Sequence, residues 1–147
     1  MGKSLRALRL WTVVSMAGLI FQYIAGLLTN AYSPSSGFTN NTDYWAINWH
    51  WTFGYALGVI ALVLLVLSAL TRRGAYIVLA AVTFAGVASA GVFGMLFVNS
   101  SPNAPVYSIA MGVAFLVSFS ANFLLSGMMM MGDRATPAAP AAWNPTP

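Results

Sequence analysis

The only histidine of the chain, His50, opens a long apolar run, and Gly54 and Gly58 follow it at four-residue steps. On a helix these positions lie along one stripe, so the imidazole would stand above a strip of surface without side chains. The chain has no Cys and only two acidic residues, which leaves His50 as nearly its only strong metal ligand. A neutral imidazole ligates haem iron, and a glycine strip lets a flat macrocycle lie against the helix. We therefore take His50 as the candidate metal ligand.

The same spacing also has a purely structural interpretation. G-x-x-x-G is a common packing device between helices in membranes. Trp49 and Trp51 flank the histidine, and aromatic side chains of this kind gather where the bilayer meets water. On this interpretation His50 belongs to an interfacial belt and binds nothing.

The elements that must position His50 are membrane helices. Of the 147 residues, 59% are hydrophobic and 5% are charged, whereas a soluble domain has about 25% charged residues. Each of four apolar spans, at roughly 8–28, 49–70, 75–98 and 106–131, is long enough to cross about 30 Å of hydrocarbon. We predict an all-α, antiparallel bundle of four transmembrane helices in a lipid bilayer, covering residues 1–134. The Pro/Ala-rich tail 135–147 is expected to be disordered.

The basic residues all fall on one side of this arrangement. They precede the first span, join the second to the third, or follow the fourth: Lys3, Arg6, Arg9, Arg72, Arg73 and Arg134. This positive-inside pattern predicts a multi-pass protein of the cell (plasma) membrane with both termini cytoplasmic. It accounts for the whole net charge of +4, so no nucleic-acid binding is expected. The short connection 71–74 predicts a tight turn between antiparallel neighbours.

The two halves of the chain resemble copies of one helical hairpin. A shift of 68 residues places Gly18 on Gly86 and Gly26 on Gly94, and a shift of 58 places Gly54 on Gly112. Under the second shift the counterpart of His50 is Ser108. We predict two duplicated hairpins, of which one carries a histidine and the other does not.

Two polar residues, Gln22 and Asn122, lie inside spans. Gln22 lies about 9 Å below the outer end of its helix and Asn122 about 24 Å below the end of its own. The two are not expected to pair. Gln22 lies near the level of His50, where it would orient the imidazole, and Asn122 is expected to form an interhelical hydrogen bond. Asn40 and Asn99 begin sequences that fit glycosylation sites.

The pattern H-x-x-x-G-x-x-x-G, in a helix that ends in basic residues and glycine, resembles the haem-ligand helices of haem A synthases. The Gly-rich centre of the third span and the segment 102–116 (PNAPVYSIAMGVAFL) extend the resemblance. A compact or half-length member would have this size. The resemblance implies haem b ligated by His50, and a role in haem A biosynthesis, terminal-oxidase assembly or respiration, with haem O, haem A or an oxidase as partner.

The chain departs from that family at three positions. Ala46 and Ile47 stand where the family has a glutamate, Trp51 where an arginine usually follows the histidine, and Ser108 at the second histidine. An enzymatic activity therefore stays open. Met111, one turn deeper than Ser108, is an alternative second ligand, and a homodimer could bring two copies of His50 together. The alternative function is a non-catalytic accessory or interaction subunit that binds no haem.

Overall fold

The protein is a bundle of four α-helices in a computed structural model that describes residues 3–32, 44–99 and 105–132. The helices are α1 (Lys3–Tyr32), α2 (Tyr44–Leu70), α3 (Gly74–Asn99) and α4 (Pro105–Gly132). The shortest has 26 residues and is about 39 Å long, which exceeds the hydrocarbon thickness of about 30 Å. All four are long and apolar enough to cross a membrane. The predicted all-α architecture is confirmed, and the described residues contain no strand.

The helices extend past the apolar spans read from the sequence. α1 begins at Lys3 instead of position 8, and α2 begins at Tyr44 instead of position 49. Hydropathy marks only the part of a helix that lies in hydrocarbon, whereas backbone hydrogen bonding continues into the interfacial layer. The glycosylation candidate Asn40 and the tail 135–147 lie outside the described residues. Asn99 is the last residue of α3, and its amide donates to the Met95 carbonyl at 2.8 Å.

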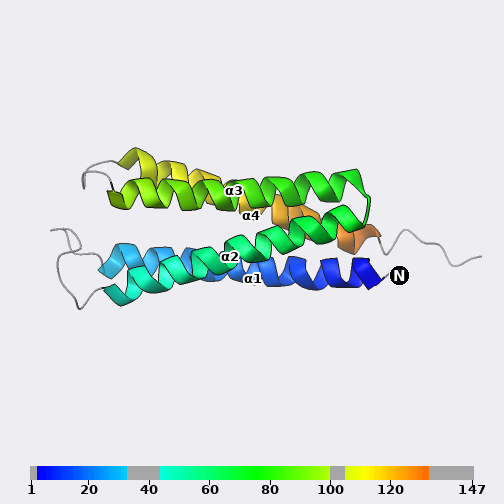
Figure 1. Ribbon diagram of the computed structural model, residues 1–147, viewed down its shortest axis with the longest axis horizontal. Helices are drawn as coiled ribbons and strands as arrows, with labels where there is room; N and C mark the ends of the chain where they lie inside the picture. Colours follow the sequence, from blue (N-terminus) through cyan, green and yellow to red (C-terminus); the bar gives the residue numbers. More distant parts are fainter. Residues whose placement is uncertain (1–2, 33–43, 100–104, 133–147) are drawn as a thin grey trace, which may run out of the picture.

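The helices form a ring in chain order. α1 packs against α2 and α4, and α3 packs against α2 and α4, while the backbones of the described helices do not approach closely across either diagonal. Packing is most extensive within the pairs α1–α2 and α3–α4, so the bundle consists of two antiparallel hairpins (Figure 1). The start of α1, the turn between α2 and α3 and the end of α4 lie together (Figure 1). We call this the basic end, and the opposite end, with His50, the histidine end.

The connection between α2 and α3 is a tight turn, as predicted. The Thr71 amide donates to the Ser68 carbonyl and the Arg72 amide to the Ala69 carbonyl, both at 3.1 Å. Arg72 adopts a left-handed conformation with φ of 56°, which reverses the chain before α3 begins at Gly74. This turn fixes the two hairpins side by side at the basic end.

Two apolar clusters fill the bundle. The cluster near the basic end takes residues from all four helices: Leu8, Leu64, Tyr76, Ala80, Leu125 and Met129. The cluster in the middle takes its fully buried residues from α1, α2 and α3, and aromatic side chains of α3 and α4 pack against it: Leu19, Leu57, Ala61 and Val87, with Phe84, Phe115 and Phe119. Beyond these clusters, toward the histidine end, the polar residues of the candidate site lie in the α1–α2 hairpin.

Glycines set the closest approach within each hairpin. A Cβ on Gly86 of α3 would overlap Ser118 Oγ of α4, and a Cβ on Gly18 of α1 would lie 3.0 Å from Leu57 and 3.8 Å from Ile60 of α2. Under the two sequence shifts Gly18 corresponds to Gly86 and Ile60 to Ser118. The pair Gly18–Ile60 thus has a counterpart in Gly86–Ser118, whereas Leu57, the nearest neighbour of Gly18, corresponds to Phe115, which is not a near neighbour of Gly86. The duplication stays a prediction.

Asn122 forms the interhelical hydrogen bond that the sequence predicted. Its side chain is fully buried, and its amide donates to the Thr12 carbonyl of α1 at 3.3 Å. A buried amide in hydrocarbon needs such a partner. The bond joins α4 to α1 toward the basic end, well away from Gln22.

Candidate site at the histidine end

His50 lies between α1 and α2 with its side chain half-buried. Its partner is Gln22 of α1, whose Nε2 lies 3.3 Å from Nδ1 and 3.4 Å from Nε2 of the imidazole. The same amide donates to the His50 backbone carbonyl at 3.1 Å. Gln22 and His50 thus lie at one depth, as the helical rise predicted, and the amide holds both the ring and the backbone of His50.

Two glycines make room for this contact. A Cβ on Gly26 of α1 would lie 3.4 Å from His50 Cε1, and a Cβ on Gly54 of α2 would lie 3.4 Å from Gln22 Nε2. Each helix therefore offers a glycine to the polar side chain of the other. We call Gln22, Gly26, His50 and Gly54 the histidine site. The sequence reasoning named Gly26 only as a repeat position, although its spacing of four from Gln22 puts both on one face of α1.

The predicted glycine strip below His50 divides into two parts. Gly54 faces Gln22 across the helix interface, so α1 already covers it. A Cβ on Gly58 would meet nothing within 4 Å. The surface on which a macrocycle was expected to lie is therefore open at Gly58 and closed at Gly54.

The two candidates for a second ligand belong to the other hairpin. Met111 of α4 packs toward α3, where its sulfur would lie 3.4 Å from a Cβ on Gly94. Ser108 is half-buried on α4. Within the described ranges neither residue forms a hydrogen bond with His50, so the structure brings Gln22 to the histidine but neither of these two.

The hydrogen bonding of Gln22 bears on metal ligation. A neutral imidazole has one N–H and one lone pair, and the Gln22 amide nitrogen is a donor to that lone pair. Gln22 Oε1 is buried and accepts no hydrogen bond. The bond to the His50 carbonyl fixes the orientation of the amide, because the reverse assignment would place Oε1 against that carbonyl oxygen. A ligating histidine donates the N–H of its second nitrogen to an acceptor, and the Gln22 amide nitrogen is a donor.

The described residues fit a site in which one imidazole ligates a haem iron, and they do not fit a site in which several side chains hold a bare metal ion. The described part of the chain has no group of three or more His, Cys, Asp or Glu side chains that would hold a bare metal ion. A macrocycle brings its own nitrogen ligands, so it needs only a histidine from the protein. No Lys or Arg occurs between Arg9 and Arg72 or between Arg73 and Arg134. Haem propionates would thus have to face water at this end instead of a basic side chain.

Aromatic side chains surround the histidine site on the lipid side. The rings of Trp49 and Phe53 lie 5.3 Å apart and those of Phe21 and Phe53 lie 6.1 Å apart. Trp49 and Trp51 are exposed, as expected for side chains of an interfacial belt. His50 differs from both because its ring turns inward to α1.

Four apolar helices in a closed ring define an all-α, multi-pass membrane protein. A comparison with protein-family models, with curated proteins and with solved structures found no match for this chain. Its chemistry therefore has to be argued from the histidine site itself.

Proposed function

We propose that the protein is a haem-associated protein of the plasma membrane in which His50 is the axial ligand. The observation that carries the proposal is the half-buried imidazole, which contacts the Gln22 amide of the neighbouring helix and lies against Gly26. Fixing the ring in this way reduces the entropy that ligation would cost. The nitrogen that binds the iron would give up its contact with the Gln22 amide, because a neutral imidazole has one lone pair. Haem b, when bound, would supply a redox-active iron at this depth of the membrane.

The resemblance to haem A synthases connects this site to haem A biosynthesis or terminal-oxidase assembly. Ala46 and Ile47, at the place of the family's glutamate, are both buried in this chain and offer no carboxylate. The proposal is therefore for binding haem b, haem O or haem A, and it includes no oxidation of the macrocycle. The basic end faces the cytoplasm on this proposal, because Lys and Arg favour that side.

A second axial ligand, where one is present, is expected from another copy of the chain. Met111 is engaged with Gly94 in the other hairpin, and Ser108 is a poor ligand for iron. A homodimer that shares a haem would use one His50 from each copy. Size measurement of the haem-loaded protein in detergent, compared with the colourless protein, tests this part separately.

The experiment is an absorption spectrum of the full chain purified from haem-producing cells. A Soret band that is present in the wild type and in Thr52→Ala but lost in His50→Ala supports ligation by His50. Thr52 is a matched control because it is exposed, lies two positions away and, among the described residues, bonds only to its own helix, at the Asn48 carbonyl. A colourless wild type, or a band that survives in His50→Ala, refutes the proposal.

Gln22 provides a second, sharper test. Gln22→Glu loses the bond to the His50 carbonyl but offers the ring N–H an acceptor, so it should retain the Soret band. Gln22→Leu has neither a hydrogen-bond donor nor an acceptor at this position and should lower haem occupancy. Equal spectra for the two variants would show that Gln22 does not orient the ligand.

A non-catalytic accessory subunit is the second candidate, favoured by one specific observation. The Gln22 amide already contacts both the ring and the carbonyl of His50. The single hydroxyl proton of Thr29 on α1 is shared between the Ala25 carbonyl of its own helix, at 2.9 Å, and the Ala46 carbonyl of α2, at 3.2 Å. These bonds join α1 to α2 without any cofactor. On this candidate the purified protein is colourless, and His50→Ala lowers only the stability of the bundle.

A further inference from the structure

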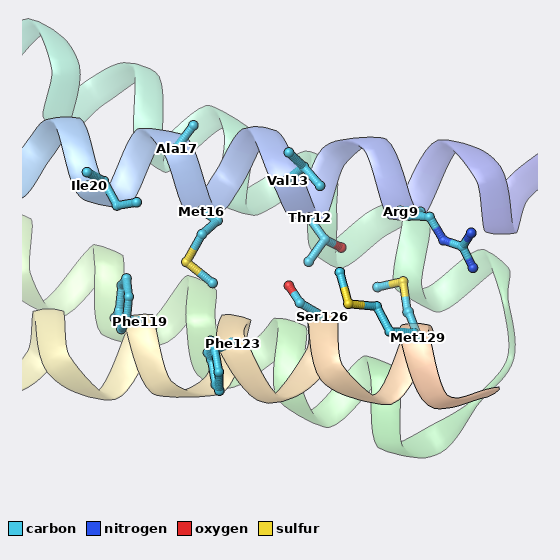
Figure 2. A pocket seen from close by; sticks show the side chains of 11 residues that line it. Arg9, Thr12, Val13, Met16, Ala17, Ile20, Phe119, Phe123, Ser126 and Met129 are labelled. Carbon is cyan, nitrogen blue, oxygen red and sulfur yellow. The ribbon is translucent and has the colours of Figure 1, made fainter. Parts of the chain in front are cut away.

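The interface between α1 and α4 contains a groove that the histidine site does not use. α1 and α4 make the least extensive of the four helix contacts, and between them lies a groove of about 520 Å³. Figure 2 shows Met16 on α1 facing Phe119 and Phe123 on α4, with Arg9 at one end. We call this space the α1–α4 groove. Its other lining residues are Thr12, Val13, Ala17, Ile20, Ser126, Met129 and Met130.

We propose that the α1–α4 groove binds one acyl chain of an anionic phospholipid, with the lipid phosphate at Arg9. The lipid belongs to the leaflet at the basic end of the bundle. This proposal is independent of haem binding at His50, which lies at the opposite end.

The length of the groove matches one leaflet. From Arg9 to Ile20 it follows α1 for about 16 Å, and half of the hydrocarbon core is about 15 Å thick. Arg9 lies at the basic end of this stretch, which is where a headgroup would be. An acyl chain that begins at Arg9 would therefore end near Ile20, at the middle of the bilayer.

The lining suits hydrocarbon although it includes two hydroxyl groups. Thr12 Oγ1 donates to the Leu8 carbonyl at 2.8 Å, and Ser126 Oγ donates to the Asn122 carbonyl at 3.0 Å. Both hydroxyl protons are thus used within their own helices, so the groove offers a ligand little hydrogen bonding. The methionines at positions 16, 129 and 130 adapt their shape to a flexible chain.

The charge at the mouth selects the headgroup. Arg9 is half-buried, and its planar guanidinium matches two phosphate oxygens in a way that an ammonium group does not. Basic side chains between transmembrane helices recognise anionic headgroups at this depth.

Native mass spectrometry of the full chain with added phosphatidylglycerol or phosphatidylcholine tests the proposal. The wild type should retain phosphatidylglycerol about tenfold more strongly, the scale of one charge-assisted hydrogen bond. Arg9→Gln should abolish this preference and Arg6→Gln should keep it, because Arg6 is exposed on the same helix outside the groove. Equal retention of both lipids by the wild type, or an unchanged preference in Arg9→Gln, would overturn the proposal.

A second pair of variants tests the groove itself. Ala17→Phe adds a ring inside the groove and should reduce binding of phosphatidylglycerol, whereas Ala56→Phe places the same ring on an exposed position of α2. Circular dichroism before lipid is added verifies that both variants fold. Undiminished lipid binding by folded Ala17→Phe, or a dimer in place of a lipid adduct, would show that a lipid does not occupy this groove.

Discussion

The contact between α3 and α4 at Gly86 is the most sensitive packing point of the described bundle, and Gly86→Ala tests it. The added Cβ would overlap Ser118 Oγ and lie 2.8 Å from the Ala114 carbonyl oxygen. Ser118 cannot turn away without losing its own bond to that carbonyl, at 3.0 Å. Overpacking of this kind costs about 1–3 kcal/mol. Since the backbone carbonyl moves only with the whole helix, we expect the overpacking in Gly86→Ala to lower the free energy of unfolding by about 2 kcal/mol.

Gly91→Ala in the same helix is the matched control. A Cβ there would meet nothing within 4 Å, so only the change in helix propensity, about 1 kcal/mol in favour of Ala, acts on it. That propensity term is common to both variants. The difference between their free energies of unfolding therefore isolates the packing term and should be about 2 kcal/mol.

Equilibrium unfolding in mixed micelles, followed by circular dichroism, measures both variants. Adding Ser118→Ala to Gly86→Ala should restore part of the loss, because the hydroxyl is removed while the Ala114 carbonyl stays. Equal stabilities for Gly86→Ala and Gly91→Ala would refute the close approach of α3 and α4 on which the argument rests.

Three further variants test other parts of the structure. Arg72→Val should be about 1–2 kcal/mol less stable than Arg72→Gly in unfolding experiments, because position 72 has a φ of 56°; equal stability would contradict the turn. Asn122→Leu should change stability by less than about 1 kcal/mol, because the lost bond from Nδ2 to the Thr12 carbonyl is offset by removal of the buried, unpartnered Oδ1. Asn122→Ala also leaves a cavity and should cost about 2 kcal/mol; the reverse order would contradict the packing. Gly26→Val should displace the His50 ring, 3.4 Å from the first added carbon, and lower the Soret band, while Gly91→Val, in open space on α3, should not.

The depth of the polar residues in the membrane could be predicted from their positions along the helices. The rise of 1.5 Å per residue placed Gln22 at the level of His50 and kept it apart from Asn122. Both expectations agree with the hydrogen bonds of the described residues. The turn at 71–74 was equally predictable, because so short a connection allows only antiparallel neighbours.

Rotation about the helix axes could not be predicted in the same way. In a soluble bundle the apolar face of a helix marks the core, but in a bilayer the lipid-facing and core-facing sides are both apolar. Nothing in the sequence therefore indicated that Gly54 faces α1 or that Met111 turns to Gly94. Small polar residues are the signal that remains, since Ser15, Thr83 and Ser118 are all fully buried.

The α1–α4 groove illustrates the same limit. Its residues occur at helical spacing in two apolar spans, and only the loose packing of α1 on α4 separates them into a groove. Arg9 was recognisable as a topological signal, but its place at the mouth of an apolar space depends on how the two helices cross.

The central proposal is that His50 is the axial ligand of a haem, and one measurement tests it most directly. The full chain, purified in mild detergent from haem-supplied cells, is compared with His50→Ala and Thr52→Ala by absorption spectroscopy. We predict a Soret band in the wild type and in Thr52→Ala that disappears in a folded His50→Ala protein. A colourless wild type would contradict the proposal and leave His50 as a structural link between α1 and α2.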